Sequence, residues 1–219
     1  MNQPIAVIFD MDGVMVDSNP FHKIALRQFC REHGYELTEQ QLREKIYGRT
    51  NRDWLTNLFG ALPEEKLLAY ADQKEFLFRE VYKNDIVSVN GLQSFLDLLD
   101  QYGIPKAIAT SAPRANVDFT LAKTGLEKYF QVILDDTFVT RGKPDPEIYI
   151  KAAAALGIPN HQCIVIEDSI SGVLAGKRAG SKVIGITTTH TADELADTDY
   201  IITDFTGWDP RVLQINVGL

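Results

Sequence analysis

Five consecutive apolar residues, IAVIF at positions 5–9, place the tightest limit on what this chain can fold into. A run that is apolar on both sides of the pleat is typical of a central parallel strand, buried on both faces. Similar runs recur later, at 105–109, 132–134, 163–166, 182–186 and 200–202. Helical spacing of apolar residues separates them, at 91–102, 114–124, 146–156, 171–179 and 192–196. This alternation of strand and helix predicts an α/β fold.

From residue 91 onward the pattern predicts a doubly wound, Rossmann-like parallel sheet with helices on both faces. Residues 17–88 break this alternation. They hold amphipathic helical stretches without a convincing strand, at 20–33, 39–47, 52–59 and 64–82. We therefore expect a Rossmann-like core made of residues 1–16 and 89–219, with a small α-helical cap domain, 17–88, inserted after the first strand.

Composition narrows the set of partners. The chain has 219 residues, long enough for a core and an insert, and a formal net charge of −8. That charge disfavours nucleic acid and anionic membranes as partners, because both require a basic surface. The first ten residues lack the basic region of a signal peptide, and no apolar stretch approaches the ~20 residues that cross a bilayer. We expect a monomer located in the cytoplasm.

Three of the predicted strands end in polar residues that can carry chemistry. They follow the first, second and fourth strands: Asp10 and Asp12, Thr110 and Ser111, and Glu167 and Asp168. In open parallel sheets, ligands bind in the crevice beyond the carboxyl ends of the strands. The coincidence across three elements therefore predicts a site at that edge of the sheet.

The acidic residues at these strand ends point to a metal ion. Asp10, Asp12, Glu167 and Asp168, with Asp17 as a fifth candidate, would repel one another in one crevice. A divalent cation would neutralise them, and an all-oxygen ligand set selects Mg²⁺. The alternative is that each acid is a helix cap or a turn residue.

Two further elements could bind an anion. Thr110 and Ser111 offer a hydroxyl and backbone N–H groups ahead of a helix, although a plain helix N-cap would explain them equally well. Lys143 lies in the sequence RGKPDP, where the two prolines restrict the backbone and favour a fixed side chain. The alternative for Lys143 is a solvated surface lysine.

Together these residues resemble the haloacid dehalogenase-like hydrolase superfamily, in the branch with a helical cap that includes β-phosphoglucomutase and many small-molecule phosphatases. Four motifs carry the resemblance and span essentially the whole chain. They are DMDGVMVDS from Asp10, Thr110 after Ile-Ala, Lys143 in KPDP, and IEDSISG around Glu167 and Asp168.

The resemblance implies a role for each core residue. Asp10 would be the nucleophile that carries an aspartyl-phosphate, and Asp12 the general acid and base. The implied Mg²⁺ ligands are Asp10, the backbone carbonyl of Asp12, Asp168 and, directly or through water, Glu167. The groups implied to bind the transferring phosphoryl oxygens are Thr110, the Ser111 amide and Lys143.

For the inserted segment the resemblance implies a cap that closes over the site. His22 and Lys74 fall where cap residues reach toward the active site, and either Arg49 or Arg52 corresponds to a cap arginine that holds a second phosphate. After Thr110 the chain departs from the mutase pattern: Ala112 and Arg114 replace an expected Ser and Asn. Arg114 could hold a distal phosphate instead. A solvated surface position is the alternative for each of these residues.

The favoured function is an Mg²⁺-dependent phosphatase of a small phosphorylated metabolite, with a β-phosphoglucomutase-like phosphosugar mutase as the alternative. Asp12 argues against dehalogenation, because dehalogenases of this superfamily usually lack an acid two positions after the nucleophile. A non-catalytic phosphoacceptor or binding module is disfavoured, since receiver domains are shorter and all core motif positions are present here. Acids in place of a Gly-rich turn exclude a dinucleotide-binding dehydrogenase.

Overall fold

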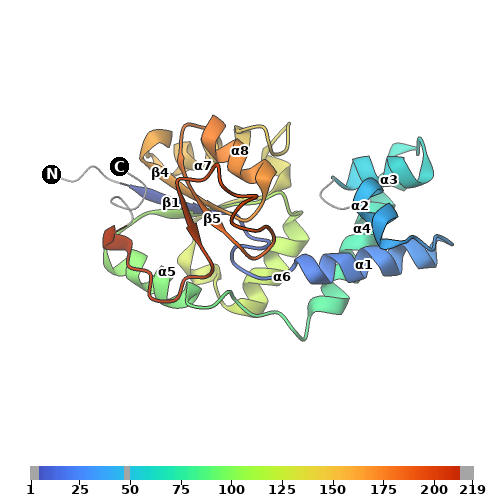
Figure 1. Cartoon of the computed structure of the whole chain (residues 1–219), viewed down its shortest axis with the longest axis horizontal. Helices are drawn as coiled ribbons and strands as arrows, with labels where there is room; N and C mark the ends of the chain where they lie inside the picture. The colour runs from blue at the N-terminus through green and yellow to red at the C-terminus, as the bar shows by residue number, and fades with distance from the viewer. Residues whose placement is uncertain (1–4, 47–49, 213–219) are drawn as a thin grey trace. The chain divides into compact units, whose positions relative to one another are not determined.

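The computed structural model describes residues 5–46 and 50–212. They form two compact units, one comprising the chain up to Asp17 and from Ile86 onward, the other Ser18–Asp85. Figure 1 shows strands and helices in the first unit and helices in the second.

A parallel sheet of six strands forms the centre of the first unit, in the order β3-β2-β1-β4-β5-β6. The strands are β1 Ala6–Phe9, β2 Lys106–Ala109, β3 Val132–Leu134, β4 Cys163–Glu167, β5 Lys182–Ile186 and β6 Tyr200–Ile202. This is the strand order of a doubly wound fold, and the order reverses between β1 and β4. The predicted Rossmann-like fold class is confirmed.

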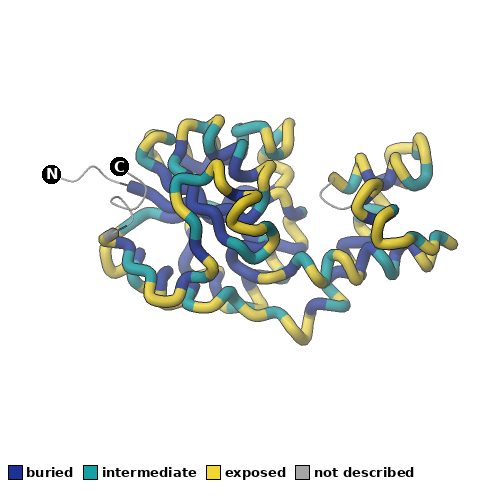
Figure 2. Tube along the Cα trace, viewed as in Figure 1, coloured by how far each residue is buried: buried dark blue, intermediate teal, exposed yellow. Residues whose placement is uncertain are grey.

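Helices cover both faces of the sheet (Figure 1). They are α5 Leu92–Gln101, α6 Arg114–Thr124, α7 Glu147–Leu156 and α8 Ile170–Arg178. Alternate residues of β1 point to opposite faces: Val7 and Phe9 pack with α5 and α6, whereas Ala6 and Ile8 pack with α7 and α8. All four residues of β1 are fully buried, as the dark tube in Figure 2 shows. The two-sided core explains why this strand is apolar at every position.

Short 3-10 turns join several of these elements, at Glu127–Tyr129, Asp136–Phe138, Asn160–Gln162 and Pro210–Val212. The helix expected at 192–196 is wrong, because residues 192–197 form hydrogen-bonded turns. The segment begins like a helix, with Thr191 and Glu194 each accepting a hydrogen bond from the other's backbone N–H. The chain then has to enter β6 at Tyr200, and a single turn is too short to stabilise a helix.

The second unit contains α1 Asn19–Glu32, α2 Glu39–Lys45, α3 Asn51–Phe59 and α4 Glu64–Tyr82. Thr38 and Gln41 form a capping box that starts α2, and the Thr50 side chain caps α3. Aromatic rings make its core: Phe29 of α1 contacts the rings of Trp54 and Tyr70 edge-on. None of the helices among the described residues is long and apolar enough to serve as a membrane span.

Candidate active site

The carboxyl ends of β1 and β4 bring three carboxylates together. Phe9 pairs with Ile166 in the sheet, and the Asp10 backbone N–H donates to the Ile166 carbonyl at 3.1 Å. Asp10 therefore lies beside Glu167, the last residue of β4, and Asp168 follows directly. One oxygen from each of these three side chains lies within 4.8 Å of the other two. All three residues are buried, and Glu167 is 0% exposed.

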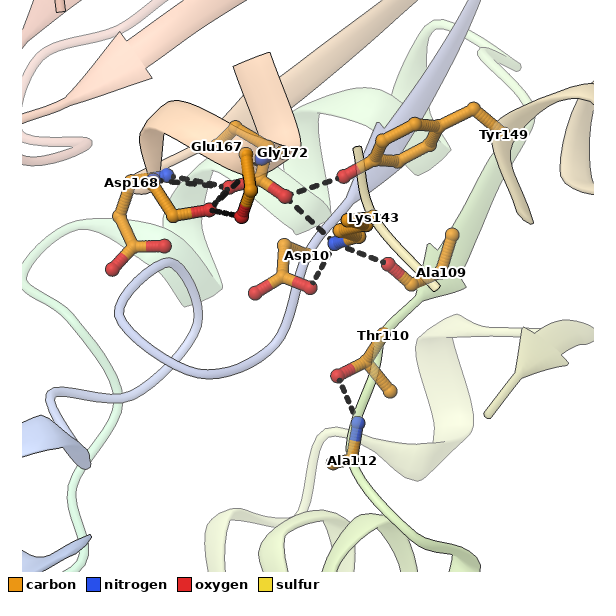
Figure 3. Close-up of polar contacts among 11 residues, drawn as sticks. Asp10, Ala109, Thr110, Ala112, Lys143, Tyr149, Glu167, Asp168 and Gly172 are labelled. Carbon is orange, nitrogen blue, oxygen red and sulfur yellow. Dashed lines mark hydrogen bonds and ion pairs between the residues drawn. The ribbon is translucent and has the colours of Figure 1, made fainter. Parts of the chain in front are cut away.

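Lys143 joins this cluster from the loop before α7 (Figure 3). Its Nζ donates to Asp10 Oδ1 at 2.6 Å, to Glu167 Oε1 at 2.7 Å and to the Ala109 carbonyl at 3.3 Å. Its side chain is only 7% exposed. Lys143 is thus a buried cation shared between two carboxylates, which excludes the alternative of a solvated surface lysine.

The site holds three carboxylates and one lysine, and this imbalance of charge shifts the pKa values of the acids. Burial raises the pKa of Asp10 to about 7, although the Lys143 charge opposes the change. Burial, with the charges of Glu167 and Asp10, raises the pKa of Asp168 to about 8. For Glu167 burial acts in the same direction, but Lys143 and several hydrogen bonds outweigh it and lower the pKa. The cluster is short of positive charge.

This donor set fits a hard divalent cation. It offers carboxylate oxygens from three buried side chains close enough to share one ion, and an added cation would relieve their mutual repulsion. Asp12 lies two residues beyond Asp10 in the tight turn that follows β1, where it pairs with Val16 in an isolated bridge. Gly13 has φ +79°, and a Cβ atom there would lie 1.9 Å from Asp168 Oδ2. This glycine lets the turn approach the Asp168 carboxylate.

Thr110 and Ser111 follow β2, the neighbour of β1. Thr110 is 1% exposed, its backbone N–H donates to Leu134, and its Oγ1 accepts from the Ala112 N–H at 3.1 Å. In Figure 3 the Thr110 hydroxyl is bonded to the Ala112 N–H, at the end of the strand beside β1, whereas Ser111 is exposed. Arg114, at the start of α6, donates to Asp118 at 2.8 Å and lies 3.9 Å from Asp135.

The remaining predicted residues belong to the helical unit. His22 on α1 and Lys74 on α4 come together, with 2.9 Å between His22 Nδ1 and Lys74 Nζ. Lys74 also donates to Glu75 at 2.9 Å and is 5% exposed. Arg52 on α3 forms a two-point ion pair with Glu64, at 2.5 and 3.0 Å. Arg49 lies outside the described residues.

Three residues of the cluster are missing from the sequence expectations. Tyr149 on α7 donates its hydroxyl to Glu167 Oε1 at 2.6 Å. The hydroxyl of Thr188 donates to the Gly13 carbonyl and that of Thr189 to Asp168 Oδ2. The two threonines follow β5, so extending the rule of polar strand ends to a further strand would have found them. Tyr149 lies six residues after Lys143, in a helix whose apolar spacing predicts an ordinary core residue at this position.

Comparisons with known proteins show which family this chain belongs to. Residues 7–186 match the model of the haloacid dehalogenase-like hydrolase family, which covers most of the chain. The chain belongs to this family. The predicted resemblance and the expectation of an enzyme are therefore confirmed.

Several proteins resemble this chain over most of their own length. Validoxylamine A 7'-phosphate phosphatase of Streptomyces hygroscopicus subsp. limoneus is 33% identical, over 91% of this chain and 93% of the relative. A phosphorylated carbohydrates phosphatase of Thermotoga maritima is 35% identical, over 83% and 84%. The crystal structure of a HAD hydrolase, family IA, variant 3, from Entamoeba histolytica superposes with a TM-score of 0.91 at 31% identity, covering 98% of this chain and 100% of that one.

A substitution at Gly172, on α8, tests how closely the protein packs around the Glu167 carboxylate. A Cβ atom there would lie 1.7 Å from Glu167 Oε1, so Gly172→Ala should destabilise the fold by about 1–3 kcal/mol through overcrowding. An alanine at an unobstructed helical glycine would instead stabilise by roughly 1 kcal/mol. Urea unfolding measures the change. The control is Gly142→Ala, where nothing lies within 4 Å and stability should hold. Equal stabilities of both variants would contradict the enclosure.

Proposed function

We propose that this protein is an Mg²⁺-dependent phosphatase of a small phosphorylated metabolite and that it works through an aspartyl-phosphate on Asp10. The observation that carries the proposal is the buried cluster in which Lys143 bridges Asp10 and Glu167 next to Asp168. The names of the two relatives, both phosphatases and one of phosphorylated carbohydrates, favour a carbohydrate phosphate as the substrate class.

In the first step, an oxygen of Asp10 attacks phosphorus and the bond from phosphorus to the leaving oxygen breaks. Asp12 gives its proton to that oxygen, so the product leaves as an alcohol and not as an alkoxide. The Lys143 ammonium, 2.6 Å from Asp10, is placed to stabilise negative charge on the phosphoryl oxygens. Thr110 and the Ser111 amide would bind the same oxygens from the end of β2.

In the second step, Asp12 acts as a base. It takes a proton from water, whose oxygen attacks phosphorus and displaces Asp10, so inorganic phosphate leaves and both aspartates regain their starting protonation. A covalent intermediate divides one difficult displacement into two easier ones. The carboxylate of Asp12 therefore needs to gain and lose one proton in each cycle.

The Mg²⁺ would be held by Asp10, the backbone carbonyl of Asp12 and Asp168, with Glu167 contributing directly or through water. When bound, the ion supplies positive charge for the phosphoryl group and for the carboxylates around it. Thr189, bonded to Asp168 Oδ2, would hold that carboxylate in orientation.

We further propose that the helical unit, Ser18–Asp85, is a cap that selects the substrate. In this proposal the cap supplies polar groups from His22, Lys74 and either Arg49 or Arg52. Arg114 of the core contributes from the start of α6. Arg52 forms an exposed ion pair with Glu64, so a substrate phosphate would compete with that carboxylate for the Arg52 guanidinium.

Substitution of the two aspartates tests the two-step reaction. Asp10→Asn should abolish phosphate release, because an amide is too weak a nucleophile. Asp12→Ala should lower kcat by about 10²–10⁴-fold, the usual contribution of a general acid and base. Both are measured as phosphate release from a panel of phosphorylated sugars, with circular dichroism as a check of folding. A well-folded Asp10→Asn protein that retains turnover would contradict the nucleophile.

One assay separates the phosphatase from the phosphosugar mutase, which shares the first step. The purified protein is incubated with β-glucose 1-phosphate and a trace of β-glucose 1,6-bisphosphate. We expect release of inorganic phosphate, since Ala112 and Arg114 depart from the mutase pattern. Conversion to glucose 6-phosphate without release of phosphate would identify the mutase and overturn the hydrolase.

A further inference from the structure

Tyr149 meets the catalytic cluster in two ways. It lies in α7, six residues after Lys143, and is completely buried. Its hydroxyl donates to Glu167 Oε1 at 2.6 Å, and its ring centroid lies 4.9 Å from Lys143 Nζ (Figure 3). A short hydrogen bond to a carboxylate and a cation over an aromatic face are both stronger when water is excluded.

Glu167 is fixed by donors on both of its oxygens. Oε1 accepts from Lys143 at 2.7 Å and from Tyr149 at 2.6 Å. Oε2 accepts from the Asp168 N–H at 3.0 Å and from the N–H and hydroxyl of Ser169 at 3.1 and 3.0 Å. A fully buried carboxylate with these partners has little freedom to move. The Glu167 carboxylate is therefore held in one position, and the donors around it are placed relative to it.

The Lys143 ammonium is bonded both to Glu167 and to Asp10, the proposed nucleophile. Its Nζ lies 2.6 Å from Asp10 Oδ1 and 2.7 Å from Glu167 Oε1. Because the Tyr149 hydroxyl also donates to Oε1, part of the negative charge on that oxygen is already compensated. Without the hydroxyl, Lys143 would be the remaining donor to Oε1 among the described residues, and its ammonium would be drawn toward Glu167 and away from Asp10.

We propose that Tyr149 is a positioning residue for phosphoryl transfer, which keeps the Lys143 ammonium at Asp10 by sharing the Glu167 oxygen and by supporting the ammonium on its ring. The inference rests on the proposed phosphatase function and extends it to a residue that makes no contact with the reacting atoms. The phenol hydroxyl of Tyr149 thus affects phosphoryl binding and turnover through Lys143, beyond forming a hydrogen bond in the core.

The chain contains a matched control in Tyr129. Its hydroxyl also donates to a carboxylate at 2.6 Å, that of Asp97, and its ring centroid lies 4.9 Å from Lys128 Nζ. Tyr129 is 6% exposed and belongs to the same compact unit, but its partners are outside the cluster of strand ends. Phenylalanine at either position removes one phenol–carboxylate hydrogen bond and keeps the ring.

The test compares Tyr149→Phe and Tyr129→Phe with the parent protein. We measure kcat and KM for p-nitrophenyl phosphate with Mg²⁺, the inhibition constant of orthovanadate, Mg²⁺ binding by calorimetry, and urea unfolding. For Tyr149→Phe, kcat should fall by about 10–100-fold, the usual effect of removing a partner that orients a ligand group. Orthovanadate should bind more weakly as well, because it is held by the same ammonium, while Mg²⁺ affinity stays unchanged. For Tyr129→Phe, kcat and orthovanadate binding should equal those of the parent.

Three results would overturn the inference. They are unchanged kcat and orthovanadate binding in Tyr149→Phe, equal losses in Tyr129→Phe, and a Tyr149→Phe protein that no longer folds, which would make the hydroxyl structural. Failure of the proposed function is distinguishable from all of these. In that case the parent protein itself would release no phosphate from any phosphorylated substrate and would bind no orthovanadate.

Discussion

The ammonium of Lys143, shared between Asp10 and Glu167, is the interaction on which the site depends. Two buried carboxylates facing each other repel, and removing them from water costs free energy that one ion pair rarely repays in full. Lys143 compensates part of this charge at distances of 2.6 and 2.7 Å. With Asp168 alongside, burial still raises the pKa of two of the three acids, and a divalent cation would complete the compensation.

The sheet determines where these charges meet. Strand order reverses between β1 and β4, so the chain leaves the two adjacent strands in opposite directions and opens a crevice at their carboxyl ends. Asp10 and Glu167 are placed there by the sheet register, with Lys143 brought in by the loop before α7. Thr188 and Thr189 extend the arrangement to β5 by binding the Gly13 carbonyl and Asp168. Four segments distant in sequence thus hold one small cluster.

Much of this architecture could be predicted from the sequence, because its signals are local. An uninterrupted apolar run identifies a strand buried on both faces, and the six runs coincide with β1 to β6. Acids after such runs indicate the crevice. Tyr149 could not be predicted, since a tyrosine at apolar helical spacing is ordinary core until its hydroxyl partner is known. The supposed helix at 192–196 failed for a related reason: its pattern is local, but the entry into β6 leaves room for turns only.

Diffraction from crystals grown with Mn²⁺ in place of Mg²⁺ tests the central claim most directly, because the anomalous signal locates the ion. The account predicts one peak in contact with carboxylate oxygens of both Asp10 and Asp168, with Lys143 still bound to Asp10. A peak elsewhere, or Asp10 and Asp168 side chains turned away from each other in the metal-bound crystal, would contradict it.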